Sequence, residues 1–167
     1  WVLMWGWGVM NSTAIKEASS VGFPRDKIIG NWWSGAESDV LPAGKSSVGY
    51  LSASFNHPSL KTKVSEDIIK YVYGGDEAAA KDKNFGQVLY NRGMIQALFS
   101  LEAMNSAQKM AGKKVINGSD MQKAYDTLDL TKARLAEIGV DGFLQGIKLS
   151  CSDHEGQHPM IMQQWDG

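Results

Sequence analysis

Trp1-Val2-Leu3-Met4-Trp5-Gly6-Trp7-Gly8 and Lys27-Ile28-Ile29-Gly30-Asn31-Trp32-Trp33-Ser34 are the two stretches that decide the fold. Each begins with a short apolar run, typical of a buried strand, and ends in a tip that carries two tryptophans. If the two strands are parallel neighbours, both tips lie at the carboxyl edge of one sheet, where open α/β sheets bind ligands. The sequence therefore predicts an α/β protein with an aromatic ligand edge.

The segment between the two stretches predicts the crossover helix that parallel strands require. The Asn-Ser-Thr run at 11–13 offers side chains that cap helices, and apolar residues then recur at helical spacing up to Val21. Gly22 and Pro24 end the run.

Downstream of the second tip the pattern changes from strands to helices. A third strand is expected over 48–55, and a charged, alanine-rich connector over 76–84. Helices are expected from Val64 to Val72, over 85–110, over 118–128 and over 131–138, and strands return at 147–151 and 160–165.

Composition excludes several classes of protein. The 167 residues carry a formal net charge of −1 and no basic cluster, which argues against nucleic acid and anionic lipid as partners. The apolar runs are shorter than the roughly 20 residues that cross a bilayer. The single cysteine, Cys151, cannot form an internal disulfide.

Two motifs suggest enzymes, and their context weakens both. His154-Glu155-Gly156-Gln157-His158 matches the zinc-hydrolase pattern H-E-x-x-H, which needs a helix to bring its two imidazoles together. The internal glycine and the following Pro159 predict a turn instead. Gly6-Trp7-Gly8 begins like a dinucleotide fingerprint, but the third glycine is replaced by Asn11 and a bulky ring occupies the turn.

The tryptophan tips are the candidate binding site. Trp7 and one of Trp32 and Trp33 are expected to form a wall that stacks on an aromatic or apolar ligand, because strand alternation sends Trp32 and Trp33 to opposite faces. Phe85 and Arg92, at the head of the long helix, are candidates for a second wall, where Arg92 would clamp a carboxylate. A buried structural role for each tryptophan, or a surface ion pair for Arg92, remains the alternative.

Several stretches together resemble one known family. They are Trp5-Gly6-Trp7-Gly8-Val9-Met10-Asn11, Ser20-Val21-Gly22-Phe23-Pro24-Arg25-Asp26-Lys27, Trp32-Trp33-Ser34-Gly35-Ala36-Glu37, Tyr90-Asn91-Arg92-Gly93 and Ser150-Cys151-Ser152-Asp153-His154-Glu155-Gly156. In this order they look like the C-terminal half of a type I periplasmic substrate-binding protein of the branched-chain amino acid ABC transporter family.

The resemblance implies two Rossmann-like lobes, each a parallel sheet with flanking helices, that close on a ligand in the cleft between them. Residues 1–56 would belong to the second lobe, the mainly helical residues 57–141 to the first, and residues 142–167 would return to the second. The chain would then be a piece of a longer protein. By itself it is expected to be unstable or to dimerise, because its sheets would have open edges.

The resemblance also implies ligand contacts. Trp7 falls where relatives that bind leucine, isoleucine or valine place an aromatic residue, and Phe85 also matches an aromatic residue that touches ligand. Asn11, which closes the first stretch, is a further expected contact. Trp32 stands where those relatives hold the ligand's ammonium group with an acidic residue. An aromatic or other organic acid is therefore favoured over an amino acid.

The expected function is solute capture for an ABC importer, with a membrane permease as partner and with no catalysis and no cofactor. The parent protein would be periplasmic, either secreted or lipid-anchored. Two alternatives stay open: a zinc-dependent hydrolase that uses His154, Glu155 and His158, and the ligand-sensing domain of a receptor.

Overall fold

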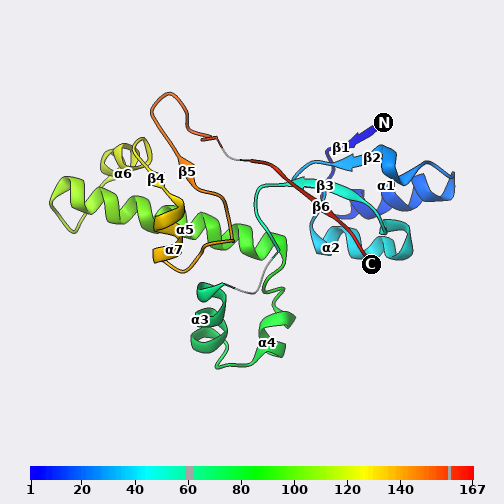
Figure 1. Cartoon of the computed structure of the whole chain (residues 1–167), viewed down its shortest axis with the longest axis horizontal. Helices are drawn as coiled ribbons and strands as arrows, with labels where there is room; N and C mark the ends of the chain where they lie inside the picture. Colours follow the sequence, from blue (N-terminus) through cyan, green and yellow to red (C-terminus); the bar gives the residue numbers. More distant parts are fainter. Residues whose placement is uncertain (59–61, 158) are drawn as a thin grey trace. The chain divides into compact units, whose positions relative to one another are not determined.

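The chain folds into two compact units (Figure 1). The structure is a computed structural model, and it describes residues 1–58, 62–157 and 159–167. Unit 1 comprises Trp1–His57 and Met160–Gly167, and unit 2 comprises Pro58–Pro159. Unit 1 contains both ends of the chain because its last strand returns to pair with an earlier one.

The return to unit 1 comes later than the sequence suggested. The sequence placed it at residue 142, whereas the structure places it at Met160. Residues 142–159 stay with the helices because Phe143 and Leu144 are buried in the core of unit 2, where Ile147 pairs with Leu130. The assignment of the two units to lobes of a larger protein remains a prediction.

Unit 1 is built on a four-stranded sheet in the order β1-β2-β3-β6. Its first three strands are parallel neighbours, and the fourth is antiparallel to β3. The strands are β1 (Val2–Met4), β2 (Ile28–Gly30), β3 (Leu51–Ser54) and β6 (Ile161–Gln164). The predicted parallel α/β arrangement is confirmed.

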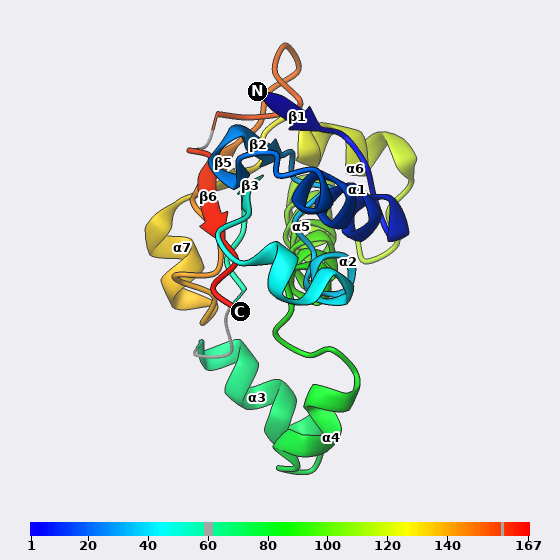
Figure 2. The same ribbon diagram turned by 90° about the vertical axis from the view of Figure 1, so that its right-hand side faces the viewer.

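One side of this sheet is covered by helices (Figure 2). They are α1 (Val9–Ser20), α2 (Glu37–Val40) and the 3-10 segment η2 (Leu41–Ser47), while a 3-10 turn, η1 (Arg25–Lys27), leads into β2. The core between sheet and helices is formed by Met4, Ile15, Ile28, Val40, Ala43 and Tyr50. Leu3 points away from this core, because successive side chains of a strand alternate between the two faces and its neighbour Met4 is buried there, and it remains 67% exposed.

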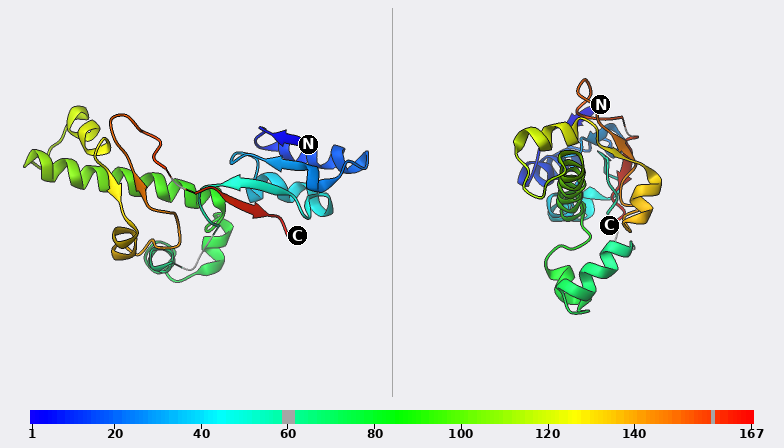
Figure 3. Two further views of the ribbon diagram at one scale, coloured as in Figure 1. Left: turned by 45° about the horizontal axis from the view of Figure 1, so that its top comes forward. Right: turned by 90° about the vertical axis from the view of Figure 1, so that its left-hand side faces the viewer.

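Unit 2 is organised around one long helix, α5, with α6 packed along it (Figure 3). The helices are α3 (Lys63–Val72), α4 (Glu77–Asp82), α5 (Val88–Ala111), α6 (Gly118–Tyr125) and α7 (Lys132–Glu137). Gly112 ends α5 with a left-handed φ of 62°, a conformation that glycine adopts without strain. Strands β4 (Asp129–Leu130) and β5 (Ile147–Lys148) pair antiparallel. Within the described residues, no helix is long and apolar enough to cross a bilayer.

The structure corrects three local predictions about where helices begin and end. Residues 76–84 are not a plain connector, because Asp76 accepts a hydrogen bond from Ala79 N (3.0 Å) and starts α4. The helix from 118 ends at Tyr125, which leaves Asp129 and Leu130 to form β4. The Asn-Ser-Thr run at 11–13 does not cap α1, which starts earlier, at Val9.

Candidate functional site

The two tryptophan tips lie next to each other in unit 1. The parallel register pairs Met4 with Gly30, so both tips leave their strands at the same edge of the sheet. The rings of Trp7 and Trp33 meet edge to face, with their centroids 5.8 Å apart. The rings of Trp32 and Trp33 are 4.0 Å apart and tilted by 31°. The structure therefore brings three of the predicted site residues together.

The expectation that Trp32 and Trp33 point to opposite faces is wrong. Strand alternation does not apply to them because β2 ends at Gly30 and the chain then turns. Ser34 N donates to the carbonyl of Asn31 (3.0 Å), and Trp33 N donates to Asn31 Oδ1 (3.0 Å). This turn stacks the two indoles on each other, so both belong to one aromatic surface.

A fourth aromatic residue, Phe55, joins this surface and was missed. Phe55 directly follows β3, and its ring lies 5.5 Å from that of Trp32. The sequence did carry the signal, since an aromatic residue follows each of the three parallel strands at its carboxyl end. We call Trp7, Trp32, Trp33 and Phe55 the aromatic tip cluster. Trp7 is 62% exposed and Trp33 is 40% exposed in the chain, so their rings can be reached from solvent.

Hydrogen bonds from two buried hydroxyl groups hold the second tip in place. The Ser34 hydroxyl is fully buried, 2.8 Å from the carbonyl of Gly6 and 3.2 Å from that of Met4. Tyr50 is 1% exposed, and its hydroxyl donates to the carbonyl of Ser34 (3.0 Å). Burial raises the pKa of Tyr50 to about 12, so its hydroxyl keeps its proton and remains a donor. These bonds tie the second tip to the end of β1 and to the first tip.

Asn11, an expected solute contact, is held by hydrogen bonds within unit 1. It is fully buried, and its amide nitrogen lies 3.0 Å from Asp39 Oδ2 and 3.5 Å from the carbonyl of Trp33. Its contact with a solute stays a prediction. Asn11 connects α1, α2 and the second tip.

Phe85 and Arg92 belong to unit 2. Phe85 is 4% exposed and packs edge to face against Tyr73 (5.9 Å between centroids) and Tyr90 (5.0 Å). Burial and a hydrogen bond with Tyr73 raise the pKa of Tyr90 to about 12. Arg92 lies on α5 and is 6% exposed. Unit 2 thus buries both predicted residues, and their contact with a solute stays a prediction.

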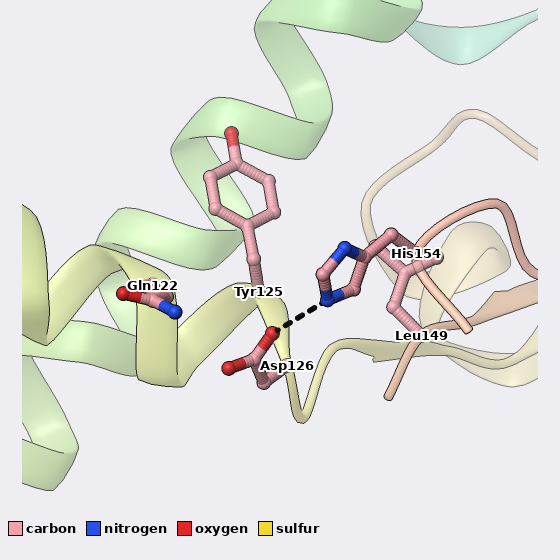
Figure 4. A pocket seen from close by; sticks show the side chains of 5 residues that line it. All are labelled: Gln122, Tyr125, Asp126, Leu149 and His154. Atoms are coloured by element: carbon pink, nitrogen blue, oxygen red, sulfur yellow. Dashed lines mark ion pairs between the residues drawn. The ribbon is translucent and has the colours of Figure 1, made fainter. Parts of the chain in front are cut away.

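Residues 154–157, the described part of the H-E-x-x-H segment, do not form the helix that a zinc hydrolase of this type needs. Asp153 Oδ1 accepts hydrogen bonds from Glu155 N (3.2 Å) and Gly156 N (2.9 Å), which makes a turn. His154 instead faces the end of α6, with its Nε2 3.3 Å from Asp126 Oδ1 (Figure 4). His158 lies outside the described residues.

The pocket beside this pair has a volume of about 260 Å³ and is lined by Gln122, Tyr125, Asp126, Leu149 and His154. The described part of the chain brings no three His, Cys, Asp or Glu side chains into a group that could hold a metal ion. The pocket lies at a surface contact between the loop of His154 and the end of α6, where His154 pairs with Asp126.

The fold and the aromatic edge define a class of ligand-binding α/β protein, and comparison with known families names it. All of the chain, residues 1–167, matches the family described as periplasmic binding protein. The chain belongs to that family, and its fold is that of the type I members.

Solved structures agree with this assignment. An ABC transporter permease from the Pseudomonas fluorescens group is 39% identical, with a TM-score of 0.89 over 100% of this chain and 40% of that chain. A branched-chain amino acid ABC transporter from Thermus thermophilus with bound valine is 21% identical, with a TM-score of 0.69 over 98% and 42% of the two chains. A solute-binding protein of an ABC transporter from Rhodopseudomonas palustris, in complex with 3,4-dihydroxy benzoic acid, is 13% identical, with a TM-score of 0.61 over 97% and 39%.

The second and third of these likenesses show the fold alone, because their sequence identity is low. The chain spans only about two fifths of the solved proteins that it matches. Among curated proteins, no sequence matches it.

Proposed function

We propose that the chain is part of the solute-binding component of an ABC importer. The observation that carries this proposal is the aromatic tip cluster, in which three parallel strands end in rings that contact one another. Membership of the periplasmic binding protein family supports it. The role is capture and delivery of a small molecule, without chemical change.

The solute that fits best is a small organic molecule with an aromatic or flat apolar part. Indole faces bind such groups by stacking and by burial of apolar surface. The resemblance to leucine-binding relatives puts Trp32 where an acidic residue would hold an ammonium group. An aromatic acid therefore fits better than an amino acid. The two chemistries also occur among the matched structures, one of which holds valine and another 3,4-dihydroxy benzoic acid.

The partners and location follow from this role. A solute-binding component delivers its cargo to a membrane permease, and its place is the periplasm, where it is secreted or held by a lipid anchor. Phe85 and Arg92 are proposed as contributions of unit 2 to recognition, with the guanidinium of Arg92 facing a carboxylate.

A thermal-shift screen of the complete protein tests the proposal. A bound solute raises the unfolding temperature by mass action, so 3,4-dihydroxybenzoate and benzoate should raise it more than valine or leucine at equal concentration. The same solutes should change the tryptophan emission, because the tips are the contact surface. If no aromatic acid shifts either signal and valine does, the proposed solute class is wrong.

A pair of tryptophan variants locates the contact. Trp33→Ala removes the ring that touches both Trp7 and Trp32, and we expect it to weaken binding of the aromatic acid at least about tenfold, since stacking contributes about 0.5–1.5 kcal/mol beyond buried area. Trp1→Ala is the matched control, because Trp1 is 74% exposed at the opposite end of β1. Equal loss in both variants would argue against recognition at the tips.

A further inference from the structure

Asp39 holds the start of α1 although it lies on another element. The backbone N–H of Gly8, the residue before α1, donates to Asp39 Oδ2 (2.5 Å). Asn11 Nδ2 donates to the same oxygen (3.0 Å), and the hydroxyl of Ser38 donates to the other oxygen, Oδ1 (3.1 Å). One carboxylate of α2 thus receives three donors, two of them from the segment that follows the first tryptophan tip.

The helix itself does not supply this negative charge. No side chain of α1 caps its N-terminus, and its first turn contains no acidic residue. The N-terminus of a helix attracts anions because its first N–H groups lack partners within the helix and its dipole is positive there. Asp39 therefore takes the position that a bound anion would occupy.

Asn11 extends the same contact to the second tip. Its amide nitrogen reaches the carbonyl of Trp33 (3.5 Å) as well as Asp39, and its Oδ1 is buried without a hydrogen-bond partner. Space is tight on that side, since a Cβ placed on Gly6 would lie 2.8 Å from this oxygen. Asn11 therefore lies close to Gly6 in the first tip and to the carbonyl of Trp33 in the second.

We propose that Asp39 is the positioning residue of the aromatic tip cluster and a determinant of its specificity. Its carboxylate fixes Gly8 and Asn11, and through them the relative placement of Trp7 and Trp33. It also fills the anion position at α1, so a solute carboxylate is excluded there and the solute meets this edge with its ring. This inference rests on the proposed function for its specificity part only.

Two variants of the complete protein test it. Asp39→Ala removes the carboxylate, whereas Asp39→Asn keeps an oxygen that accepts from Gly8 N. Asp26→Ala is the matched control, because Asp26 lies in unit 1 with its side chain 77% exposed and 3.9 Å from its nearest cation, Lys27 Nζ. The probes are benzoate and its neutral isostere benzamide.

We expect Asp39→Ala to weaken benzamide binding about tenfold, because a charged hydrogen-bond partner is lost. Benzoate should lose less affinity, because the position that Asp39 leaves empty at the start of α1 can accept the carboxylate of benzoate. The ratio of benzoate affinity to benzamide affinity should therefore rise about fivefold or more. Asp39→Asn should lie between wild type and Asp39→Ala for benzamide, and Asp26→Ala should change neither affinity by more than about twofold.

Near-ultraviolet circular dichroism of the solute-free proteins is the second readout, because it reports the packing of the indoles. Asp39→Ala should change the tryptophan bands, and the other two variants should leave them close to wild type. Unchanged bands, or an affinity ratio that does not move, would overturn the inference. If wild type binds neither probe, the proposed solute class and the specificity part fail together, and the dichroism alone decides the positioning part.

Discussion

Gly35→Ala should destabilise unit 1 selectively, because Gly35 lies where no side chain fits. A Cβ at this position would overlap Ser52 Oγ and Gln163 Nε2 and would lie 2.7 Å from Ser52 Cβ. Gln163 Nε2 donates to the carbonyl of Gly35 (2.6 Å) and to Ser52 Oγ (2.8 Å), so it joins β6 to β3 and to the loop after the second tip. The added methyl group must displace at least one of these partners.

The expected cost follows from these contacts. Forcing a methyl group into a packed site costs about 1–3 kcal/mol. Each hydrogen bond of Gln163 that is broken adds about 0.5–1.5 kcal/mol. We therefore expect a loss of about 2–4 kcal/mol in the free energy of unfolding of unit 1. With an m value of about 2 kcal/mol/M, the urea midpoint falls by about 1–2 M.

Tryptophan emission is the appropriate assay, because all six tryptophans lie in unit 1. Urea unfolding followed by this signal reports unit 1 alone, while far-ultraviolet circular dichroism is dominated by the helices of unit 2. The matched control is Gly93→Ala on α5, an exposed position where a Cβ meets nothing within 4 Å. It should stabilise the helix by about 0.5–1 kcal/mol and leave the tryptophan midpoint unchanged.

The reasoning is refuted if Gly35→Ala moves the tryptophan midpoint by less than about 0.2 M, or if Gly93→Ala moves it as far. A partial rescue gives a further check. In a Gln163→Ala background the overlap with Nε2 disappears, so adding Gly35→Ala should cost clearly less than in wild type.

Three further outcomes are expected. Glu102 accepts two hydrogen bonds of 2.8 Å from Arg134, and these bonds lower the pKa of Glu102. The ionised carboxylate therefore stabilises the fold fully above its ordinary pKa of 4.5, and this stabilisation is lost as the pH falls through the lowered pKa. Glu102→Gln should therefore cost about 1 kcal/mol at pH 7, measured by urea unfolding, and progressively less as the pH falls below 4.5. The same change at Glu137, whose side chain is 69% exposed, should cost less than about 0.5 kcal/mol. Phe143→Ala empties the core of unit 2 and should cost about 3–5 kcal/mol in the helical signal with no change in the tryptophan signal; parallel loss of both would show that the units do not unfold separately. The 167-residue chain by itself should self-associate through open sheet edges such as β1. A chain that elutes as a monomer in size-exclusion chromatography and unfolds cooperatively would contradict this.

Much of the fold was predictable because its signals are local. The apolar runs before each tip specify β1 and β2, and the helical periodicity up to Met110 with Gly112 after it specifies α5 within a few residues. The capping box of Asn117 and Asp120 also acts over four residues and starts α6. Such patterns depend on neighbours in sequence, so a single chain is enough to recognise them.

The missed features depend on contacts between distant residues. The two-residue strand β4 has no periodicity of its own and forms because Leu130 pairs with Ile147 of the predicted strand β5. The stacking of Trp32 on Trp33 depends on a turn at Asn31 that the buried hydroxyl of Ser34 ties to the distant carbonyls of Met4 and Gly6. Nothing in the local sequence indicates that Asp39 reaches back 31 positions to the N–H of Gly8.

The sequence by itself determined that tryptophans end two neighbouring strands, because apolar runs and turn residues act locally. Its motif stretches also resemble those of a periplasmic binding protein. Only the tertiary structure decided how the tips are used. It buries Asn11, stacks both indoles of the second tip, adds Phe55 and places Asp39 at the start of α1. The physical reason is that side-chain direction beyond the end of a strand is set by hydrogen bonds and packing with residues distant in the chain.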